Sequence, residues 1–419
     1  MLKLSHLAET LIPSEIIKLG NEINDKIRNG AKIYNFTIGD FDPSIFPIPQ
    51  SLEDEIVNAY RNKKTNYPPA NGIAPLRDSV ANFIKQRLGL DYPSSSFLIS
   101  GGGRPLIYAA YRSICNEGEK VIYPVPSWNN NHYTHFVSGE HIVVETTAEN
   151  NFLPTAEELI PHFKDASLLA LCSPLNPTGT VFSKDQLSKI CEAVLEENKT
   201  RTEGQKPLFI LYDQIYWTLT YGESVHYNPV SLYPELKEYT IFIDGISKAF
   251  CATGVRVGWA FGPSELIDKM KGILSHIGAW SPMAEQFGTA LFLKKDADVD
   301  TFLSNTKKAI HERLTTIYNG IIQLKNAGYP IDAISPKAAM YLTIRFSFKN
   351  KKTRNGLEIK TTEDMTSFLL NNASIAIVPF AAFGANADSE WYRLSVGTCH
   401  IEEIPQMLNN LKIAMDQLT

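Results

Sequence analysis

The most regular feature of the sequence is an alternation of short apolar runs with longer helical patterns between about Ser96 and Gly262. Most of the apolar runs are rich in branched residues and are flanked by turn-forming residues, so each predicts a buried β-strand. The predicted strands are Phe97–Ser100, Val121–Tyr123, Ile142–Val144, Leu168–Cys172, Phe209–Tyr212, Thr240–Ile243 and Val257–Phe261. Strands that alternate with helices predict an α/β fold, in which a mostly parallel sheet lies between two layers of helices.

Two of the intervening helices have clear signals. Their apolar positions follow the spacing of one helix face. These positions are Leu106, Ile107, Ala110 and Ile114 in the first helix and Leu187, Ile190, Val194 and Leu195 in the second. Ser183, with Gln186 three residues later, has the form of a capping box, which predicts that the second helix begins there.

Beyond about Asp300 the pattern changes to that of a smaller α+β unit. The predicted elements are a long helix over Phe302–Lys325, strands over Met340–Phe346, Ile375–Val378 and Tyr392–Val396, a capped helix from Thr361 or Thr362, and a closing helix. We therefore predict a large domain over residues 46–300. Residues 301–419, together with an N-terminal arm over residues 1–45, are predicted to form a smaller domain.

The composition excludes several functions. The chain has 419 residues, of which 44% are hydrophobic, and a formal net charge of −5. It can therefore bury a large core, and it has no positive field that would attract nucleic acid or an anionic membrane. No apolar run approaches the length of a membrane span, and no residue cluster predicts a metal site. Five scattered cysteines without a Cys-x-x-Cys pair are typical of reduced thiols, which predicts a cytoplasmic protein.

Candidate functional residues gather directly after the predicted strands, where ligands bind in sheets of this kind. The segment Ser100-Gly101-Gly102-Gly103-Arg104 joins a strand to a helix. Glycines let the backbone approach a phosphate, and the N-terminal end of the following helix favours the negative charge of that phosphate. A tight strand-to-helix turn without a ligand explains the segment equally well.

Two further candidates are side chains that are also common for other reasons. Trp128 could stack on a flat heteroaromatic ring, although a lone tryptophan is more often part of a core. Asn176, in Asn176-Pro177-Thr178-Gly179, can donate its amide to a ligand oxygen, although Asn-Pro is also a common way to begin a turn.

Charged side chains and one phenol complete the set. Asp213 and Tyr216 follow a strand, and a buried carboxylate there is paired or functional, whereas an exposed turn is the alternative. Lys248 can act as a nucleophilic amine where apolar neighbours shield it, with Arg256 nearby to bind a dianion. A solvated lysine is the commoner situation. The planar fork of Arg393 suits a carboxylate, in a ligand or in a structural ion pair.

Taken in this order, these signals resemble the fold-type I pyridoxal-phosphate (PLP) aminotransferases of class I and II, the aspartate-aminotransferase-like group. The segment Asp244–Ala260, DGISKAFCATGVRVGWA, is similar to the cofactor-lysine signature of that family. The resemblance extends from Gly39 to Arg393, and Tyr67 also matches a family motif. It implies an α/β fold of the PLP-dependent transferase type, with a mostly parallel seven-stranded sheet in a large domain and a smaller α+β domain.

The resemblance implies a catalytic role for three residues. Lys248 would hold the cofactor as a Schiff base and then move a proton between the substrate Cα and the C4′ carbon of the cofactor. Asp213 would pair with the protonated pyridine nitrogen. Tyr216 would hydrogen-bond the phenolate oxygen of the cofactor, and Asn176 would contact the same oxygen.

The remaining matches imply contacts to cofactor and substrate. Trp128 would stack on the cofactor ring. Tyr67 would reach the phosphate of the neighbouring subunit, which implies a homodimer with shared active sites. Arg393 would bind the substrate α-carboxylate, with help from Gly39 and Asn176. Phosphate contacts are implied for Gly102, Gly103, Arg104, Ser247 and Arg256.

Two departures from the family pattern concern anion binding. Many relatives carry a hydroxyl three residues before the lysine, where this chain has Gly245, so Ser247 is the expected substitute. Some dicarboxylate-specific relatives carry a basic residue where this chain has Ile12. Arg104 then becomes the candidate for a distal carboxylate, and an apolar or aromatic substrate stays open. Trp280 lies in a segment that resembles one lent by the partner subunit to the substrate pocket. It would favour a bulky substrate there, and a tryptophan packed in the subunit interface is the equal alternative.

The predicted function is ping-pong transfer of an amino group from an L-amino acid, aspartate-like or aromatic, to a 2-oxo acid such as 2-oxoglutarate. A PLP-dependent C–S lyase or related synthase of the same fold is the alternative, because the two reactions differ only in which bond is held perpendicular to the ring. A PLP-binding regulatory module is a third hypothesis. Such proteins usually carry an added DNA-binding domain, for which this acidic chain has no segment.

Overall fold

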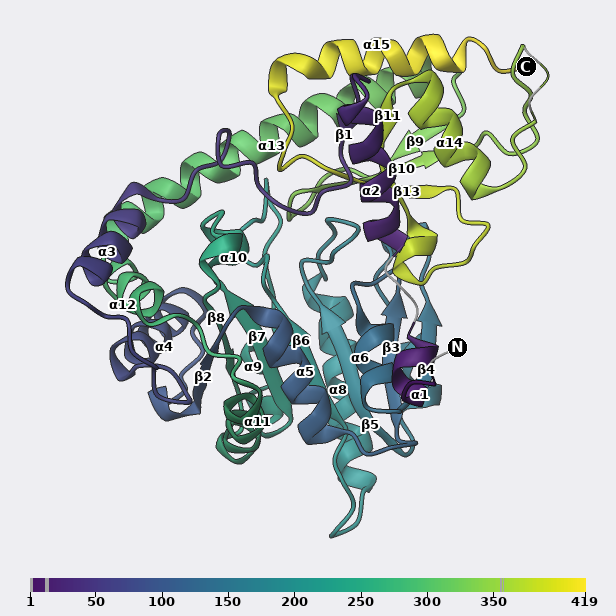
Figure 1. The fold of residues 1–419 in the computed structure, drawn as a ribbon. Helices are drawn as coiled ribbons and strands as arrows, with labels where there is room; N and C mark the ends of the chain where they lie inside the picture. Colours follow the sequence, from purple (N-terminus) through teal and green to yellow (C-terminus); the bar gives the residue numbers. More distant parts are fainter. Residues whose placement is uncertain (1–2, 12–14, 355, 357) are drawn as a thin grey trace.

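A computed structural model describes residues 3–11, 15–354, 356 and 358–419, so Ile12 lies outside the described residues. Figure 1 shows a large sheet surrounded by helices and a smaller α+β unit above it, next to the long helix α13 (Asp296–Asn326). Among the described residues, no helix is both long and apolar enough to cross a membrane.

The larger sheet has seven strands in the order β2-β8-β7-β6-β5-β3-β4. Only β8 runs antiparallel to its neighbours, β2 and β7; the other pairs are parallel. The strands are β2 (Phe97–Ser100), β3 (Lys120–Val125), β4 (Glu140–Glu145), β5 (Ala166–Cys172), β6 (Phe209–Asp213), β7 (Thr240–Gly245) and β8 (Gly258–Phe261). The predicted α/β fold with a mostly parallel sheet is confirmed.

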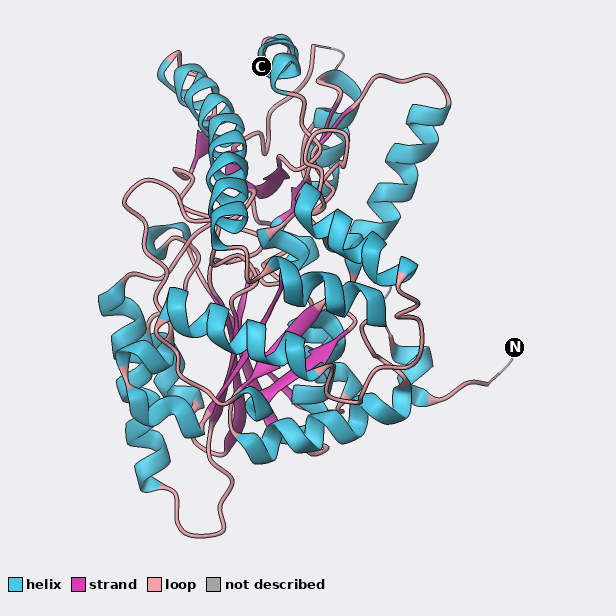
Figure 2. Ribbon diagram, turned by 90° about the vertical axis from the view of Figure 1, so that its left-hand side faces the viewer, coloured by secondary structure: helices cyan, strands magenta, loops and turns pink. Residues whose placement is uncertain are grey.

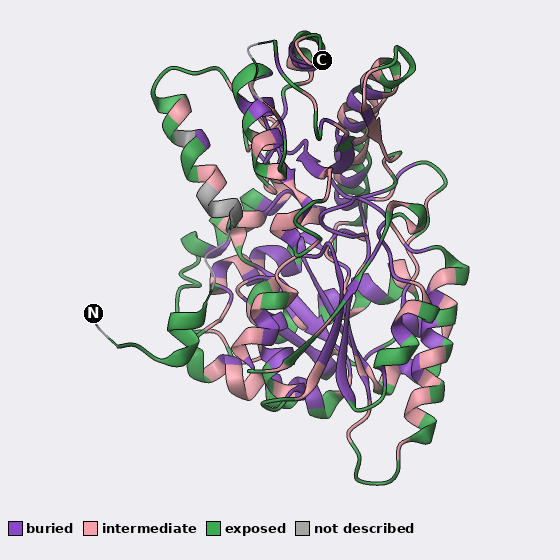
Figure 3. Cartoon of the chain, turned by 90° about the vertical axis from the view of Figure 1, so that its right-hand side faces the viewer, coloured by how far each residue is buried: buried purple, intermediate pink, exposed green. Residues whose placement is uncertain are grey.

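Helices cover both faces of this sheet, as Figure 2 shows. Along β6, Ile210 and Tyr212 belong to one apolar core and Leu211 to the other, because successive side chains point to opposite faces. Apart from the mostly exposed edge strand β4, the strands are therefore buried on both sides (Figure 3). The first core packs against α4 (Ala74–Leu88), α8 (Lys184–Thr200) and α12 (Met283–Phe292), and the second against α5 (Gly103–Ile114), α6 (Asn130–Phe136) and α11 (Ser264–Ile277).

The smaller unit contains an antiparallel sheet in the order β12-β13-β10-β9 and a separate parallel pair, β1 with β11. The strands are β1 (Tyr34–Asn35), β9 (Ile331–Ala333), β10 (Tyr341–Phe346), β11 (Ile375–Ala376), β12 (Val378–Pro379) and β13 (Trp391–Ser395). The prediction of one strand over Ile375–Val378 is wrong. The segment divides between two sheets because its first half pairs with the N-terminal arm.

Helix α13 connects the two units. Its residues Val299 and Leu303 lie in a core of the large sheet, whereas Ile310 and Leu314 lie in the core of the smaller unit. The predicted cap at Thr361 is confirmed, because its side chain accepts a hydrogen bond from the backbone of Asp364. The other helices are α1 (His6–Thr10), α2 (Glu15–Arg28), α3 (Gln50–Arg61), α7 (Ala156–Leu159), α9 (Pro229–Leu232), α10 (Ile246–Ala249), α14 (Thr362–Asn372) and α15 (Ile404–Met415).

The predicted capping box of helix α8 forms only in part. Ser183 accepts a hydrogen bond from the backbone N–H of Gln186 at 3.2 Å, as expected. The side chain of Gln186 does not return to Ser183 but donates to the carbonyls of Leu153 and Pro154. The reciprocal half is lost because a neighbouring loop offers this amide better placed acceptors.

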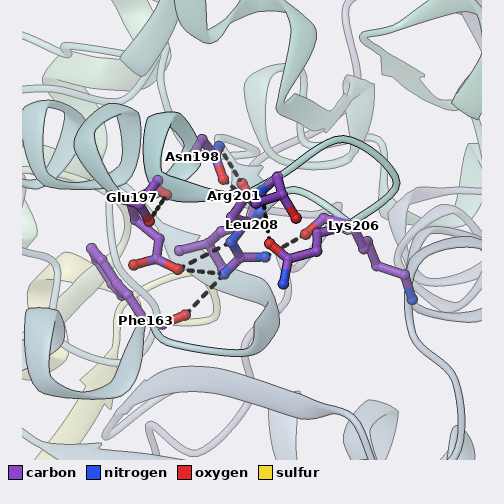
Figure 4. Close-up of polar contacts among 9 residues, drawn as sticks. Phe163, Glu197, Asn198, Arg201, Lys206 and Leu208 are labelled. Carbon is purple, nitrogen blue, oxygen red and sulfur yellow. Dashed lines mark hydrogen bonds and ion pairs between the residues drawn. The ribbon is translucent and has the colours of Figure 1, made fainter.

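At the amino-terminal ends of β5 and β6, Arg201 ties helix α8 to the sheet (Figure 4). Its guanidinium donates to the Glu197 carboxylate at 3.0 Å and to the Phe163 carbonyl at 2.9 Å. Beside it, Asn198 and Leu208 exchange two hydrogen bonds just before β6 begins. The charge of Arg201 is thus neutralised within the chain, which marks this arginine as a structural residue.

Candidate active site

A cavity of about 590 Å³ lies at the carboxyl-terminal edge of the large sheet, beside the smaller unit. The large unit lines it with residues from the loops that follow its strands, and the smaller unit contributes Arg393. The predicted site residues that line it are Gly39, Gly103, Arg104, Trp128, Asn176, Asp213, Tyr216, Ser247, Lys248, Arg256 and Arg393. The structure therefore brings together all predicted site residues except Gly102 and Tyr67.

Lys248 projects from helix α10, directly after β7. Its Nζ donates to the Gly39 carbonyl at 2.6 Å and lies about 6 Å from the centres of two aromatic rings, at 5.8 Å from Phe41 and 6.0 Å from Tyr216. Burial lowers the pKa of Lys248 to about 8, with Asp40 opposing the change and Arg393 adding to it. Roughly a tenth of this amine is therefore uncharged at pH 7, far more than for a solvated lysine, and the uncharged form is the nucleophile.

Asp213 is the last residue of β6. One oxygen of its carboxyl accepts a hydrogen bond from the backbone of Ile215 at 3.0 Å. Among the described residues, no lysine, arginine or histidine forms an ion pair with it. Burial raises the pKa of Asp213 to about 6, although the Ile215 N–H opposes the change. A cationic ligand atom beside this carboxyl would stabilise its ionised form.

Tyr216 makes a contact that the sequence did not predict. Its hydroxyl lies 2.5 Å from that of Tyr341, at the start of β10. Burial raises the pKa of Tyr216 well above its usual range, so the group remains a protonated phenol that can donate a hydrogen bond. The ring of Tyr341 also lies under the Arg393 guanidinium, 4.8 Å from its carbon. Tyr341 thus connects the two units within the cavity.

Arg393 is only 2% exposed. Its Nη1 donates to Asn176 Oδ1 at 3.1 Å and its Nη2 to the Thr37 carbonyl at 2.6 Å. Its Nε has no hydrogen-bond partner among the described residues, and no carboxylate in that part of the chain pairs with it. Burial lowers the pKa of Arg393. The structural ion pair that was the alternative explanation is not formed by the described residues, and a ligand carboxylate would supply the missing charge.

Arg256 and the N-terminus of α5 form a cationic corner of the cavity. Arg256 donates to the carbonyls of Gly101 at 2.7 Å and Thr253 at 2.8 Å. A Cβ atom at Gly102, whose φ is +97°, would lie 2.3 Å from Arg256 Nη2. Gly102 does not line the cavity itself; its missing side chain lets the guanidinium lie across the helix end. Gly103 and Arg256 then face the cavity together.

The departure at Gly245 has a steric explanation. A Cβ atom at this position would lie 2.9 Å from Gly258 Cα and 2.9 Å from the Val257 carbonyl oxygen on the neighbouring strand. No side chain fits between β7 and β8 here without a backbone shift. Ser247 lines the cavity two residues later, so its hydroxyl is available for a ligand.

Trp128 and Arg104 form the opposite wall. The Arg104 guanidinium carbon lies 5.3 Å from the centre of the Trp128 ring, and this ring contacts Phe383 at 6.2 Å. Arg104 is exposed, and no carboxylate among the described residues pairs with it. This wall therefore offers a flat aromatic face and a free cation.

Tyr67 lies outside the cavity. It is 79% exposed, and its ring contacts Trp280 edge to face with a centroid distance of 5.2 Å. Ser100 and Gly101 fix the segment before Trp280, because the Ala279 carbonyl accepts hydrogen bonds from both of them. Tyr67 and Trp280 therefore form a second aromatic surface beside the end of β2.

The sequence did not identify several residues that line the cavity. They are Gly20, Thr37, Ile38, Asp40, Ile107, Cys172, Ile215, Ile243, Thr253 and Tyr341. Asp40 and Thr253 lie in segments that match the family, and the Thr253 hydroxyl donates to Asp40 at 2.6 Å. Thr37 and Tyr341 have no comparable local signal, because only the approach of the smaller unit brings them to the cavity.

A parallel sheet with a nucleophilic lysine, an unpaired carboxyl and a buried arginine at its carboxyl-terminal edge is the arrangement of a PLP-type aminotransferase. The sequence pattern of the family described as aminotransferase class I and II matches residues 31–411. The chain belongs to this family. It is an aminotransferase, as the sequence predicted, and enzymes of this family use PLP.

Individual relatives agree with this assignment. The aspartate aminotransferase of Bacillus sp. (strain YM-2) is 27% identical over 384 residues, which cover 91% of this chain and 92% of the relative. A probable aspartate/prephenate aminotransferase of Rhizobium leguminosarum bv. phaseoli is 27% identical over 92% of both chains. The crystal structure of the Rhizobium meliloti aspartate aminotransferase covers 100% of both chains with a TM-score of 0.91 and 26% identity. The Thermus thermophilus enzyme with maleate has a TM-score of 0.87 and 25% identity over 99% of this chain and 100% of its own.

Proposed function

We propose that this protein transfers amino groups with PLP as its cofactor, with aspartate or a similar dicarboxylic amino acid as donor and 2-oxoglutarate as a suitable acceptor. The observation that carries the proposal is the presence of Lys248, Asp213 and Arg393 in one cavity without opposite charges bound to them. The reaction is ping-pong: the donor leaves its amino group on the enzyme and departs as an oxo acid, and the acceptor then collects that group.

The residues of the cavity fit PLP. Asp213 has no cationic partner among the described residues and suits a protonated ring nitrogen. The N-terminus of α5, Arg256 and Ser247 suit a phosphate, and Trp128 presents an aromatic face to a ring. When bound, PLP supplies an aldehyde to which amines attach and a ring that withdraws electrons from the substrate Cα.

Lys248 holds the cofactor and moves the proton. Its lowered pKa makes the uncharged amine available for attachment. With PLP bound, the Lys248 amine, once free, would accept the proton of the substrate Cα. Tyr216 stays protonated and would donate a hydrogen bond to the phenolic oxygen of the cofactor, and the Asn176 amide would assist, because the Asn176 oxygen is occupied by Arg393.

Arg393 binds the substrate α-carboxylate. Its Nη groups already donate to neutral oxygens, and its Nε is unpartnered among the described residues, so an incoming carboxylate gains a charge-assisted hydrogen bond. Gly39 and Asn176 flank this position. We propose that the arm (residues 1–45) and the small domain (residues 301–419) close on the large domain (residues 46–300) when substrate binds, which excludes water from the reacting atoms.

Arg104 is the residue that we propose for the second carboxylate of a dicarboxylic substrate. It is exposed at the cavity and pairs with no carboxylate among the described residues. The names of the Bacillus relatives, which are aspartate aminotransferases, support this choice. The Thermus structure with maleate, a dicarboxylate, supports it as well.

We also propose that two copies of the chain share their active sites. The exposed Tyr67, outside its own cavity, is suited to contact the phosphate bound in the partner subunit. Trp280 beside it is suited to border the substrate pocket of that subunit. The cytoplasmic location that the cysteine pattern predicts stays a prediction.

The visible absorption of the PLP-loaded protein, followed while single L-amino acids are added without an acceptor, tests the function. L-Aspartate is expected to bleach the band and to yield one oxo acid per site, whereas L-alanine acts more weakly. Arg104→Met is expected to lose at least about tenfold in the response to aspartate while its response to alanine stays unchanged. Lys248→Ala is expected to show neither band nor turnover.

Two outcomes of this experiment contradict the proposal. Release of pyruvate and ammonia from L-cysteine or a related substrate, without any oxo-acid acceptor, would identify a lyase instead. A protein that takes up no PLP would exclude the cofactor and with it the whole reaction.

A further inference from the structure

A buried carboxyl lies between the two loops that carry the main candidate catalytic residues, although it does not line the cavity. Asp244 is 1% exposed and is the residue before the last one of β7. Its neighbour Ile243 lines the cavity, so the Asp244 side chain points to the opposite face of the sheet. None of the substrate or cofactor roles proposed above uses this group.

The two oxygens of Asp244 connect the two loops. Oδ2 accepts a hydrogen bond from the Trp217 indole Nε1 at 2.8 Å, and Oδ1 accepts one from the Gly245 backbone N–H at 2.7 Å. Trp217 directly follows Tyr216 in the loop after β6. Gly245 directly precedes helix α10, which carries Lys248. One carboxyl thus binds both loops, and it does so only because each of its oxygens can accept.

The loop after β6 transmits the position of Trp217 to its neighbours. The Trp217 backbone N–H donates to the Gln214 carbonyl at 2.8 Å, and Gln214 is fully buried directly after Asp213. The Trp217 ring also packs against Phe83, with a centroid distance of 5.7 Å. A shift of this indole would therefore move the short segment between Asp213 and Tyr216 as a unit.

The ionisable groups around Asp244 suggest that hydrogen bonding, rather than charge, determines its role. Burial raises the pKa of Asp244 to about 8, against the lowering effect of Gly245 and Trp217, and the Asp213 carboxyl adds to the rise. Behind Trp217, burial lowers the pKa of His226 to about 3, so this imidazole is neutral. The hydrogen bonds from Gly245 and Trp217 oppose the effect of burial and favour the carboxylate form of Asp244, in which both oxygens accept.

We propose that Asp244 is a positioning residue that, through Trp217, fixes Tyr216 and Asp213 relative to Lys248. This role rests on the function proposed above. An asparagine at this position has the same size but only one acceptor oxygen. Its NH₂ group would face either the Trp217 indole N–H or the Gly245 backbone N–H, which would then lose its acceptor. An N–H group that loses its acceptor in a buried site destabilises the arrangement that it held.

The test compares Asp244→Asn and Trp217→Phe in the PLP-loaded protein. Each variant is expected to shift the pH midpoint of the visible cofactor band by about 0.5–1 unit, the effect of one hydrogen bond on the group that titrates. We expect kcat to fall about 3–10-fold while KM for the amino acid changes less than about twofold, because Arg393 is untouched. The double variant is expected to shift the midpoint no further than either single variant.

Trp259→Phe is the matched control. Trp259 is a fully buried indole on β8, in the core against which the partly buried Trp217 packs, and its Nε1 has no hydrogen-bond partner among the described residues. This variant is expected to lower stability and leave the midpoint unchanged. If Asp244→Asn does not fold, Trp217→Phe provides the test.

The proposal is overturned if the midpoint does not move in the Asp244 and Trp217 variants, if their effects add, or if the Trp259 control moves it equally. These results differ from a failure of the proposed function. In that case the unmodified protein itself would show no visible band with PLP, or Lys248→Ala would retain the band.

Discussion

The charged side chains at the two ends of the large sheet differ in whether they form ion pairs within the chain. At the amino-terminal end, Arg201 and Lys206 are bound to carboxylates and carbonyl oxygens of their own chain. At the carboxyl-terminal end, Lys248, Asp213 and Arg393 line one cavity, and none of them forms an ion pair within the described residues. Unpaired charges of this kind destabilise a fold, so their presence at one edge indicates that a ligand completes them there.

The carboxyl groups of Glu119 and Asp213, one at each end of the sheet, differ in pKa, and this difference can be measured. Burial favours the neutral form of both, but Lys206, Asn116 and Ser167 hydrogen-bond Glu119 and lower its pKa to about 2. Asp213 has only one backbone donor, and burial raises its pKa to about 6. Hydrogen bonds therefore keep Glu119 ionised at one end against the effect of burial, whereas the ionised form of Asp213 at the other end depends on a ligand.

The largest effect on substrate binding is expected from Arg393→Met. Loss of a charged hydrogen-bond donor to the substrate carboxylate, about 1.5–3 kcal/mol, raises KM for amino and oxo acids by roughly 10–100-fold. Steady-state kinetics with aspartate and 2-oxoglutarate measure this. A KM within threefold of the original value would show that Arg393 does not bind the substrate carboxylate. It would also weaken the contrast drawn between the two ends of the sheet.

Lys248→Met is expected to abolish turnover and to stabilise the cofactor-free protein. Because the folded pKa is about 8 rather than 10.5, the unfolded chain binds more protons between these pH values, and the stability of the original protein rises with pH there. The variant is therefore more stable near pH 7, by up to about 3 kcal/mol, and the gap closes toward pH 10.5. Denaturant unfolding from pH 6 to 10.5 measures the gap; a less stable variant at pH 7 contradicts this prediction.

Arg201→Met is the converse experiment at the amino-terminal end. It leaves the Glu197 carboxylate and the Phe163 carbonyl without their donor, so the free energy of unfolding falls by about 2 kcal/mol. The kinetic constants of the folded enzyme stay unchanged. Urea unfolding and steady-state kinetics on the same preparation check both statements, and altered kinetics would show that the two ends are coupled.

Glu119→Gln tests the pH dependence of the ion pair with Lys206. The contribution of this pair is present above the usual glutamate pKa of about 4.5 and is lost as pH falls toward 2, because the folded pKa is lowered. We expect a loss of about 1–2 kcal/mol at pH 7 that shrinks below pH 4.5. Lys206→Met is the matched control and should give a similar loss. A constant difference down to pH 2 would argue against the pair.

The smallest effect is expected from Tyr341→Phe. It removes the hydroxyl that orients the Tyr216 phenol, worth about 0.5–1.5 kcal/mol, so kcat falls about 2–10-fold. KM for the amino acid is expected to stay within twofold, because the ring beneath Arg393 remains. Phe348→Leu, a substitution in the core of the smaller unit, is the control. If kcat falls equally in both variants, the effect of Tyr341→Phe comes from altered packing and not from the lost hydroxyl.

Much of this molecule was predictable from local sequence. The seven apolar runs correspond to seven strands, mostly because a strand buried on both faces reads as a continuous apolar run; only β4, at the edge, is largely exposed. Lys248, Asp213 and Asn176 could be named because they directly follow strands and match family motifs. The division of Ile375–Val378 between two sheets could not be predicted, since its partner strand lies in the N-terminal arm, more than 300 residues away.

The sequence by itself determined the class of fold and the family, and it indicated Lys248 as the candidate nucleophile, because periodicity and short motifs record burial and local backbone geometry. Only the tertiary structure decided which charges stay unpaired, that Gly102 makes room for Arg256, that Tyr341 contacts Tyr216, and that Asp244 accepts a hydrogen bond from Trp217. The physical reason is that pairing and positioning depend on distances between segments far apart in the chain, whereas a local pattern carries no information about such distances.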